Sequence, residues 1–280
     1  TYSFESPKVF DKLLIPAGSP LRNTVTISNP LGEDFSIMRT ISLNGMLTSL
    51  STNFNRRNKD VRLYELGNIY LPKQEPVTEL PEERMQFTLG FYGDGDFNTM
   101  KGVIEEFLYK AGMNLKPEYD PESELSFLHP GRQANVIYDG QVIGYLGEVH
   151  PTVAANYSIK DRVYVAVIDM PEIVSRATFD RKYEGIAKYP AVSRDLSMVV
   201  PKHVLAGDIE KVFDERGGKI LESYELFDIY EGAQIKAGFK SLAYKLTFRA
   251  KDRTLEEADI TAAMKKIMNG LERLGIELRQ

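Results

Sequence analysis

The chain has 280 residues, with 35 lysines and arginines against 40 aspartates and glutamates, and it contains neither cysteine nor tryptophan. The absence of cysteine excludes disulfide bonds, cysteine-ligated zinc, iron–sulfur clusters and thiol catalysis, and three histidines leave little material for a histidine-based site. The net charge of −5 argues against a protein whose whole surface binds nucleic acid. Since neither a signal peptide nor an apolar run of the roughly 20 residues that span a membrane is present, we expect a cytoplasmic globular protein.

The length fits two domains, and the charge is distributed unevenly between them. Residues 1–185 hold 19 basic and 25 acidic side chains, whereas residues 186–280 hold 16 and 15. The change falls directly after a polar stretch at 181–185. We therefore expect one domain over 1–185 and a second over 186–280.

The first domain mixes helices and strands. One helix is marked by apolar residues that share a single helical face, namely Leu43, Met46, Leu47, Leu50 and Phe54. A second helix is expected over 100–108, ending at Gly112. Strands are expected at 24–27, 62–71, 85–92 and 163–168, with a hairpin over 134–149 that turns at Asp139-Gly140. This order predicts an α+β domain on a largely antiparallel sheet.

The second domain shows a simpler order of elements. Strands are expected at 196–200, 220–230, 241–249 and 276–279, with helices over 205–213 and 254–274. Thr254 and Glu257 have the spacing of a capping box at the start of the second helix. The order β-α-β-β-α-β predicts a ferredoxin-like fold, in which both helices cover one face of the sheet and leave the other face open.

The open face of this sheet follows from the alternation of side chains along each strand. Alternation turns Phe227 and Ile229 toward the helices. It gathers an aromatic ring, hydrogen-bonding groups and three cations on the open face: Asp228, Tyr230, Ser241, Lys245, Arg249 and Arg279. This is the chemistry of a platform for single-stranded RNA. A solvated sheet face or a protein-docking surface would show the same pattern, and both alternatives remain open.

The other polar clusters do not form a convincing site. Asp94 and Asp96 have the spacing of a calcium loop, but Thr99 occupies the position that requires glycine, which favours a polar turn before a helix. Glu148 and His150 lie two residues apart at a strand end, where a structural hydrogen bond is more plausible than acid–base catalysis. We therefore predict no catalytic residues and no metal ligands, and the residues alone indicate a two-domain binding or interaction protein.

Short sequence runs along the whole chain carry a family resemblance. The sequence resembles the C-terminal part of the β subunits of the bacterial phenylalanine–tRNA ligase family. The runs that carry this resemblance are Thr1–Phe4, Asn29–Leu31, Ser36–Thr40, Asn53–Arg56, Tyr64–Gly67, Lys101–Gly102, His129–Arg132, Ile143–Pro151, Tyr189–Asp195, Leu226–Tyr230, Lys240–Tyr244, Arg253–Glu257 and Leu278–Arg279.

The resemblance implies a noncatalytic subunit of a ligase. Residues 1–185 would form a class II synthetase-like antiparallel core that has lost catalysis, and residues 186–280 a ferredoxin-fold anticodon-binding domain. The partners implied are the catalytic α subunit, within an α2β2 heterotetramer, and phenylalanine tRNA. ATP and magnesium would be used by the holoenzyme, with no cofactor held by this part of the chain. Domains for tRNA binding, editing and magnesium ligation would precede Thr1.

For the anticodon contacts, the resemblance points to the face already reached by alternation. It implies that Asp228, Tyr230, Ser241 and Arg279 contact the anticodon, with Lys245 and Arg249 as weaker candidates. An alternative function is that of a stand-alone paralogue, which would dock a protein through the same sheet and bind no tRNA.

Overall fold

The computed structural model describes residues 1–180, 183, 185–232 and 234–279. The chain forms two compact units, residues 1–180 and 181–280, and each contains its own buried core. The sequence predicts a boundary between residues 185 and 186, a few residues after the one in the structure. The polar stretch on which that prediction rests lies partly outside the described residues. Within the described part of the chain, no helix has the length and apolar character needed to cross a membrane.

The first unit is built on a six-stranded antiparallel sheet. Its strands, in spatial order, are β3 (Val61–Leu71), β4 (Glu82–Tyr92), β8 (Val163–Asp169), β7 (Gln141–Val149), β6 (Leu128–Tyr138) and β5 (Glu118–Asp120). Asp139 and Gly140 join β6 to β7 with φ of +50° and +73°. Two consecutive positive φ angles are what a two-residue hairpin turn requires, which confirms the predicted hairpin.

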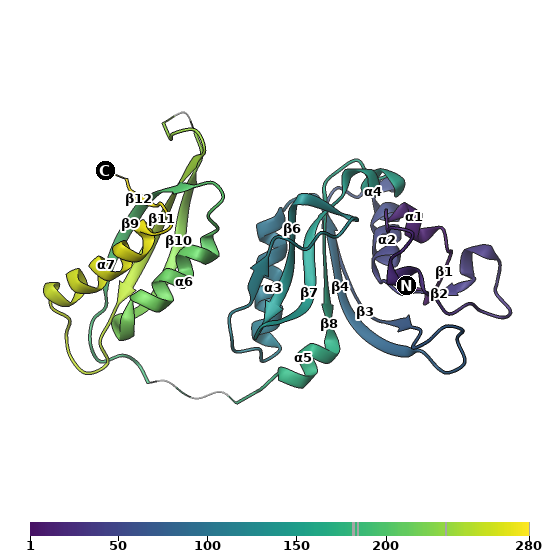
Figure 1. Cartoon of the computed structure of the whole chain (residues 1–280), viewed down its shortest axis with the longest axis horizontal. Coiled ribbons are helices and arrows are strands. Elements are labelled where there is room, and N and C mark those ends of the chain that lie inside the picture. Colours follow the sequence, from purple (N-terminus) through teal and green to yellow (C-terminus); the bar gives the residue numbers. More distant parts are fainter. Residues whose placement is uncertain (181–182, 184, 233, 280) are drawn as a thin grey trace. The chain divides into compact units, whose positions relative to one another are not determined.

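Helices cover both faces of this sheet (Figure 1). On one face lie α1 (Val9–Lys12), α2 (Leu43–Asn55) and α4 (Pro151–Asn156), and on the other lie α3 (Phe97–Lys110) and α5 (Met170–Arg176). The central strand β8 contributes Val163, Val165 and Val167 to the first core, whereas Tyr164 and its alternate neighbours enter the second. A strand that is buried on both faces is expected to be a continuous apolar run in the sequence, and β8 is such a run.

A small second sheet and three short 3-10 turns are further minor elements. The sheet pairs β1 (Phe4–Glu5) with β2 (Ile37–Met38), and the turns are η1 (Pro20–Arg22), η2 (Glu33–Phe35) and η3 (Gly218–Ile220). The strand expected at 24–27 is reduced to a single bridge between Thr26 and Ile37. Backbone hydrogen bonds from Ile27 to Ser36 and from Met38 to Val25 flank this bridge.

The second unit has the order β-α-β-β-α-β, as predicted. Its elements are β9 (Val192–Pro201), α6 (Ala206–Arg216), β10 (Leu221–Tyr230), β11 (Phe239–Phe248), α7 (Glu257–Glu272) and β12 (Glu277–Leu278). The strands pair antiparallel in the order β10-β11-β9-β12. Figure 1 shows α6 and α7 together on one side of this sheet, and no described helix covers its opposite face.

The core of the second unit lies between this sheet and its two helices. Phe213 on α6 is fully buried, and its ring meets that of Tyr244 on β11 edge to face, with the ring centroids 5.1 Å apart. Leu246 and Phe248 follow Tyr244 on the same side of β11 and are also fully buried. The apolar alternation along β11 is therefore what fixes which face of the sheet the helices cover.

Helix α7 begins at Glu257, so the capping box predicted between Thr254 and Glu257 is wrong. The amide of Glu256 donates instead to a carboxylate oxygen of Asp259 at 3.0 Å. The guanidinium of Arg253 donates to the same carboxylate at 2.6 and 2.8 Å, and these contacts lower the pKa of Asp259 to about 2. Asp259 therefore has the role in the first turn of α7 that the prediction gave to Glu257, two residues earlier.

Phe213 provides a test of this core. We expect Phe213→Ala to lower the free energy of unfolding of the second unit by about 3–5 kcal/mol, because it removes a ring from a closed core. Chemical denaturation of the chain would measure the loss. Phe227→Ala is the matched control, since that ring is 50% exposed and its removal should change the midpoint little. Equal losses for both variants would contradict the assigned core.

Glu5 on β1 is an acidic side chain inside the first unit, with an exposed fraction of 5%. The Asn44 amide donates to one of its carboxylate oxygens at 2.9 Å. The other oxygen, Oε1, meets no hydrogen-bond partner among the described residues. Burial raises the pKa of Glu5 to about 7, against the smaller opposing effects of Asn44 and Arg39. The carboxyl group is therefore stable here mainly in its neutral form.

The raised pKa of Glu5 predicts a dependence of stability on pH. Between its ordinary value of 4.5 and about 7 the unfolded chain loses this proton while the folded chain keeps it. The free energy of unfolding should therefore fall as pH rises through that window, by up to about 3 kcal/mol, and level off above it. Glu5→Gln should flatten the fall in denaturation midpoints, whereas Glu122→Gln, at an exposed position, should not. An unchanged slope in Glu5→Gln would refute the prediction.

Candidate nucleic-acid interface

The open face of the second unit carries a compact cluster at one end of the sheet. Tyr230 on β10 pairs in register with Ser241 on β11, which pairs in turn with Val199 on β9. Since paired residues point to the same side of a sheet, these three side chains share the open face. The predicted positions of Tyr230 and Ser241 on one face are therefore consistent with the strand register.

Arg279 joins this cluster from the far edge of the sheet. It follows β12 directly, and its backbone amide donates to the carbonyl of Ser197 on β9 at 2.9 Å. Its Nη1 donates to Ser241 Oγ at 3.4 Å, and its guanidinium carbon lies 5.9 Å from the ring centroid of Tyr230. The side chain thus crosses β9 to reach β11 and β10. Ser241 is only 4% exposed, while Tyr230 is 37% exposed.

Asp228 and Lys245 extend the open face along the same two strands. Asp228 is exposed and lies opposite Ala243, two residues before Lys245 on β11. Within the described part of the chain, no hydrogen bond or ion pair engages the Asp228 carboxylate. Lys245 lies in register between Glu225 on β10 and Asp195 on β9. This part of the face therefore combines one cation with several hydrogen-bond acceptors.

Phe227 also lies on the open face, so its predicted orientation toward the helices is wrong. The pairing between β10 and β11 skips one residue between Leu226 and Asp228, which leaves Phe227 as the extra residue of a β-bulge. Its ring is 50% exposed, and its centroid lies 5.9 Å from Nζ of Lys245. In the sequence, only the two adjacent apolar residues Leu226 and Phe227 interrupt the alternation and indicate an irregularity in the strand. This interruption does not predict toward which face the ring of Phe227 points.

Arg249 lies apart from the cluster. It follows β11 at the end of the strand where Phe248 pairs with Leu221, whereas Tyr230 and Ser241 mark the other end. Its Nε donates to Glu222 at 3.0 Å and its Nη1 to the carbonyl of Tyr189 at 2.8 Å. Of the six predicted residues, the strand register places Asp228, Tyr230, Ser241, Lys245 and Arg279 on the open face, and contacts join Tyr230, Ser241 and Arg279. The structure places Arg249 at the opposite end of the strands with two nitrogens already engaged.

The remaining polar clusters have structural partners. Asp96 caps α3 by accepting the amide of Thr99 at 2.9 Å, as expected for a polar turn before a helix. Glu148 accepts Nε of Arg132 at 2.6 Å, and His150 accepts the amide of Thr152 at 3.2 Å at the start of α4. In the described ranges, no three histidine, aspartate or glutamate side chains are grouped so that they could hold a metal ion.

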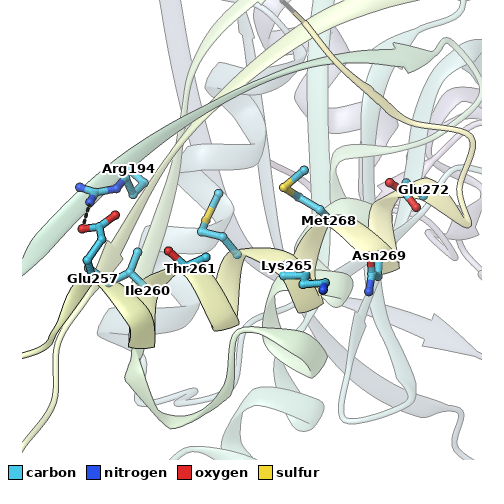
Figure 2. A pocket seen from close by; sticks show the side chains of 9 residues that line it. Arg194, Glu257, Ile260, Thr261, Lys265, Met268, Asn269 and Glu272 are labelled. Carbon is cyan, nitrogen blue, oxygen red and sulfur yellow. Dashed lines mark hydrogen bonds and ion pairs between the residues drawn. The ribbon is translucent and has the colours of Figure 1, made fainter.

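A shallow groove of about 350 Å³ runs along α7 on the helix side of the same unit. Figure 2 shows Arg194 paired with Glu257 near one end of the groove and Glu272 near the other, and the pair is separated by 2.6 Å. Between these ends the groove is lined by Ile260, Met264 and Met268, with polar residues at its margin. Its lining offers apolar contact rather than acid–base chemistry.

A sheet in the order β10-β11-β9-β12, with both helices on one face and the other face open, is the ferredoxin-like class of domain. Residues 187–279 match the family described as "Ferredoxin-fold anticodon binding domain". Residues 1–170 match the family described as "Phenylalanyl tRNA synthetase beta chain CLM domain". The chain therefore belongs to the phenylalanyl-tRNA synthetase β chain family.

Similar proteins agree with this assignment. The chain is 44% identical over 280 residues to the phenylalanine–tRNA ligase beta subunit of Clostridium tetani, covering 100% of this chain and 35% of that protein. It is 45% identical over 279 residues to the beta subunit of Clostridium acetobutylicum, covering 99% and 35%. The chain thus spans about a third of the length of these curated relatives.

A solved structure shares the fold at low sequence identity. The pyrrolysyl-tRNA synthetase from Desulfitobacterium hafniense superimposes with a TM-score of 0.51 and 15% identity, over 62% of this chain and 60% of that one. At this identity the likeness concerns the fold alone.

Gly232 provides a test of how Tyr230 is held. A Cβ atom at Gly232 would lie 2.3 Å from Oη of Tyr230, so Gly232→Ala should displace the ring from its present position. Proton contacts between the Tyr230 ring and the Arg279 side chain, measured by NMR, should then change. Gly207→Ala is the control, because a Cβ there meets no atom within 4 Å. Retention of the contacts in Gly232→Ala would show that the ring is not placed as described.

Proposed function

We propose that the chain is a noncatalytic part of a phenylalanine–tRNA ligase β subunit. In this proposal the second unit binds the anticodon of phenylalanine tRNA, and the first unit supports the catalytic α subunit within an α2β2 heterotetramer. The observation that carries the proposal is the cluster of Tyr230, Ser241 and Arg279 on the uncovered face of an anticodon-binding fold.

Each member of the cluster has a physical role in binding an unstacked anticodon base. Tyr230 offers a ring for stacking, a contact worth about 1–3 kcal/mol per base. Asp228, which has no partner among the described residues, is an acceptor for the N–H groups on a guanine edge, and Ser241 can donate or accept a hydrogen bond. Arg279 combines a cation with a planar group, so it can meet phosphate or stack on a base. Lys245 would add charge from the next part of the face, and Arg249 would contribute less because of its existing partners.

The proposed role of the first unit is that of a class II synthetase-like core without catalysis. The likeness of fold to a synthetase supports this role. So does the engagement of Asp96, Glu148 and His150 in structural contacts. In the proposed complex, ATP and magnesium would be used by the α subunit. Membership of the β chain family favours this function over that of a stand-alone interaction module.

Replacement of Tyr230 tests the anticodon role. We expect Tyr230→Ala to weaken the binding of phenylalanine tRNA to the assembled ligase by about 5- to 150-fold, the equivalent of one lost stacking contact. Filter binding and aminoacylation rates would measure the effect. Ile229→Ala is the matched control, because Ile229 is 58% exposed but pairs with Leu242 of the core and so lies on the other side of the sheet. Unchanged affinity in Tyr230→Ala would rule out stacking at this ring.

A further inference from the structure

A second ring and cation lie on the open face, outside the Tyr230 cluster. Phe227 is the extra residue of the β-bulge, and Nζ of Lys245 lies 5.9 Å from its ring centroid. The same separation joins Arg279 to Tyr230. The open face therefore repeats one arrangement, an aromatic ring beside a cation, at two places along β10 and its neighbours.

The bulge places Phe227 and Asp228 on the same face. Counted forward from Leu226, which lies opposite the buried Tyr244, alternation puts Phe227 on the open face, and without the extra residue Asp228 would be turned toward the core. With it, Phe227 and Asp228 are both directed away from the helices, and the ring is left 50% exposed. A β-bulge that re-aims a side chain is typical of functional sites. Here it sets a hydrogen-bond acceptor directly beside an exposed ring.

The two rings are too far apart to serve one base. Tyr230 lies opposite Ser241, whereas the ring of Phe227 lies against Lys245, four residues further along the regular strand β11, which corresponds to about 13 Å at a rise of about 3.3 Å per residue. Successive stacked bases lie only about 3.4 Å apart. A strand lying on this face would therefore place a different base on each ring, with the bases separated from one another.

The charges around Phe227 indicate that stacking dominates there. Lys245 lies between Glu225 and Asp195, and Asp228 follows Phe227 directly. These carboxylates offset the charge of Lys245, so this part of the face attracts phosphate less than Arg279 does. They also provide acceptors for amino groups on the edge of a base.

We propose that Phe227 is a second base-stacking residue of this sheet, where it takes an anticodon-loop base other than the base on Tyr230. Lys245 orients the ring through its cation–π contact, and the neighbouring carboxylates accept from the base edge. The proposal rests on the proposed function, since it requires single-stranded RNA on the open face.

The test uses the assembled ligase and the anticodon stem–loop of phenylalanine tRNA, with 2-aminopurine replacing one loop base at a time. Stacking of this base on a ring changes its fluorescence. We expect Phe227→Ala to abolish the change at one loop position and Tyr230→Ala to abolish it at another. Phe227→Ala should also weaken binding by about 5- to 150-fold, by the same factor at low and high salt because no cation is removed.

Two further variants distinguish the effect of an aromatic ring from the effect of apolar volume at position 227. Phe227→Tyr keeps an aromatic ring and should retain the fluorescence change, whereas Phe227→Leu keeps apolar volume and should lose it. Ile229→Ala again controls for an exposed apolar side chain on the opposite side of the same strand, and it should behave like the unmodified protein.

The outcomes distinguish this proposal from the one on which it rests. If Tyr230→Ala weakens binding while Phe227→Ala behaves like Ile229→Ala, the role of Phe227 is overturned and the anticodon function stands. The role is equally overturned if both ring variants act on the same loop position. If the unmodified ligase does not bind the stem–loop, the anticodon function itself fails, and the role of Phe227 fails with it.

Discussion

The candidate interface depends on one constraint, the period of two along a β-strand. Each long strand of the second unit must give one face to the helices, because Tyr244, Leu246 and Phe248 on β11 have to be buried. Every residue between them is then committed to the opposite face. The polar and charged residues gathered there are thus held in position by core packing on the other side of the sheet, and the face needs no loops to build it.

The same constraint explains how far the sequence predicted the structure. Alternation and helical periodicity are local patterns, and they were enough to predict the β-α-β-β-α-β order and the shared face of Tyr230 and Ser241. The bulge at Phe227 could not be predicted in this way, because a skipped register depends on the hydrogen bonds of the partner strand. The start of α7 was missed for a related reason. The capping carboxylate, Asp259, lies within the helix that the pattern assigns.

The reach of Arg279 illustrates another limit of sequence patterns. Its alternation on the last strand was predictable, but its contacts with Ser241 and Tyr230 follow from the position of β12 at the edge beside β9. In the first unit, alternation along β8 directs side chains into a buried core on each face of the sheet. A sheet covered on both faces has no surface left for a platform of this kind. The antiparallel sheet of the first unit is therefore packed on both faces, whereas that of the second unit is packed on one face and exposed on the other.

The contact between Arg279 and Ser241 has a consequence for any ligand of the open face. Ser241 is 4% exposed, and its hydroxyl oxygen already accepts a hydrogen bond from the guanidinium of Arg279. A ligand donor that took this oxygen in place of Arg279 would exchange one contact for another. It would replace everything that is lost only if it also offered an acceptor to the guanidinium. In the proposed function, selectivity at this position would therefore be set by the contacts that the protein makes before any ligand arrives.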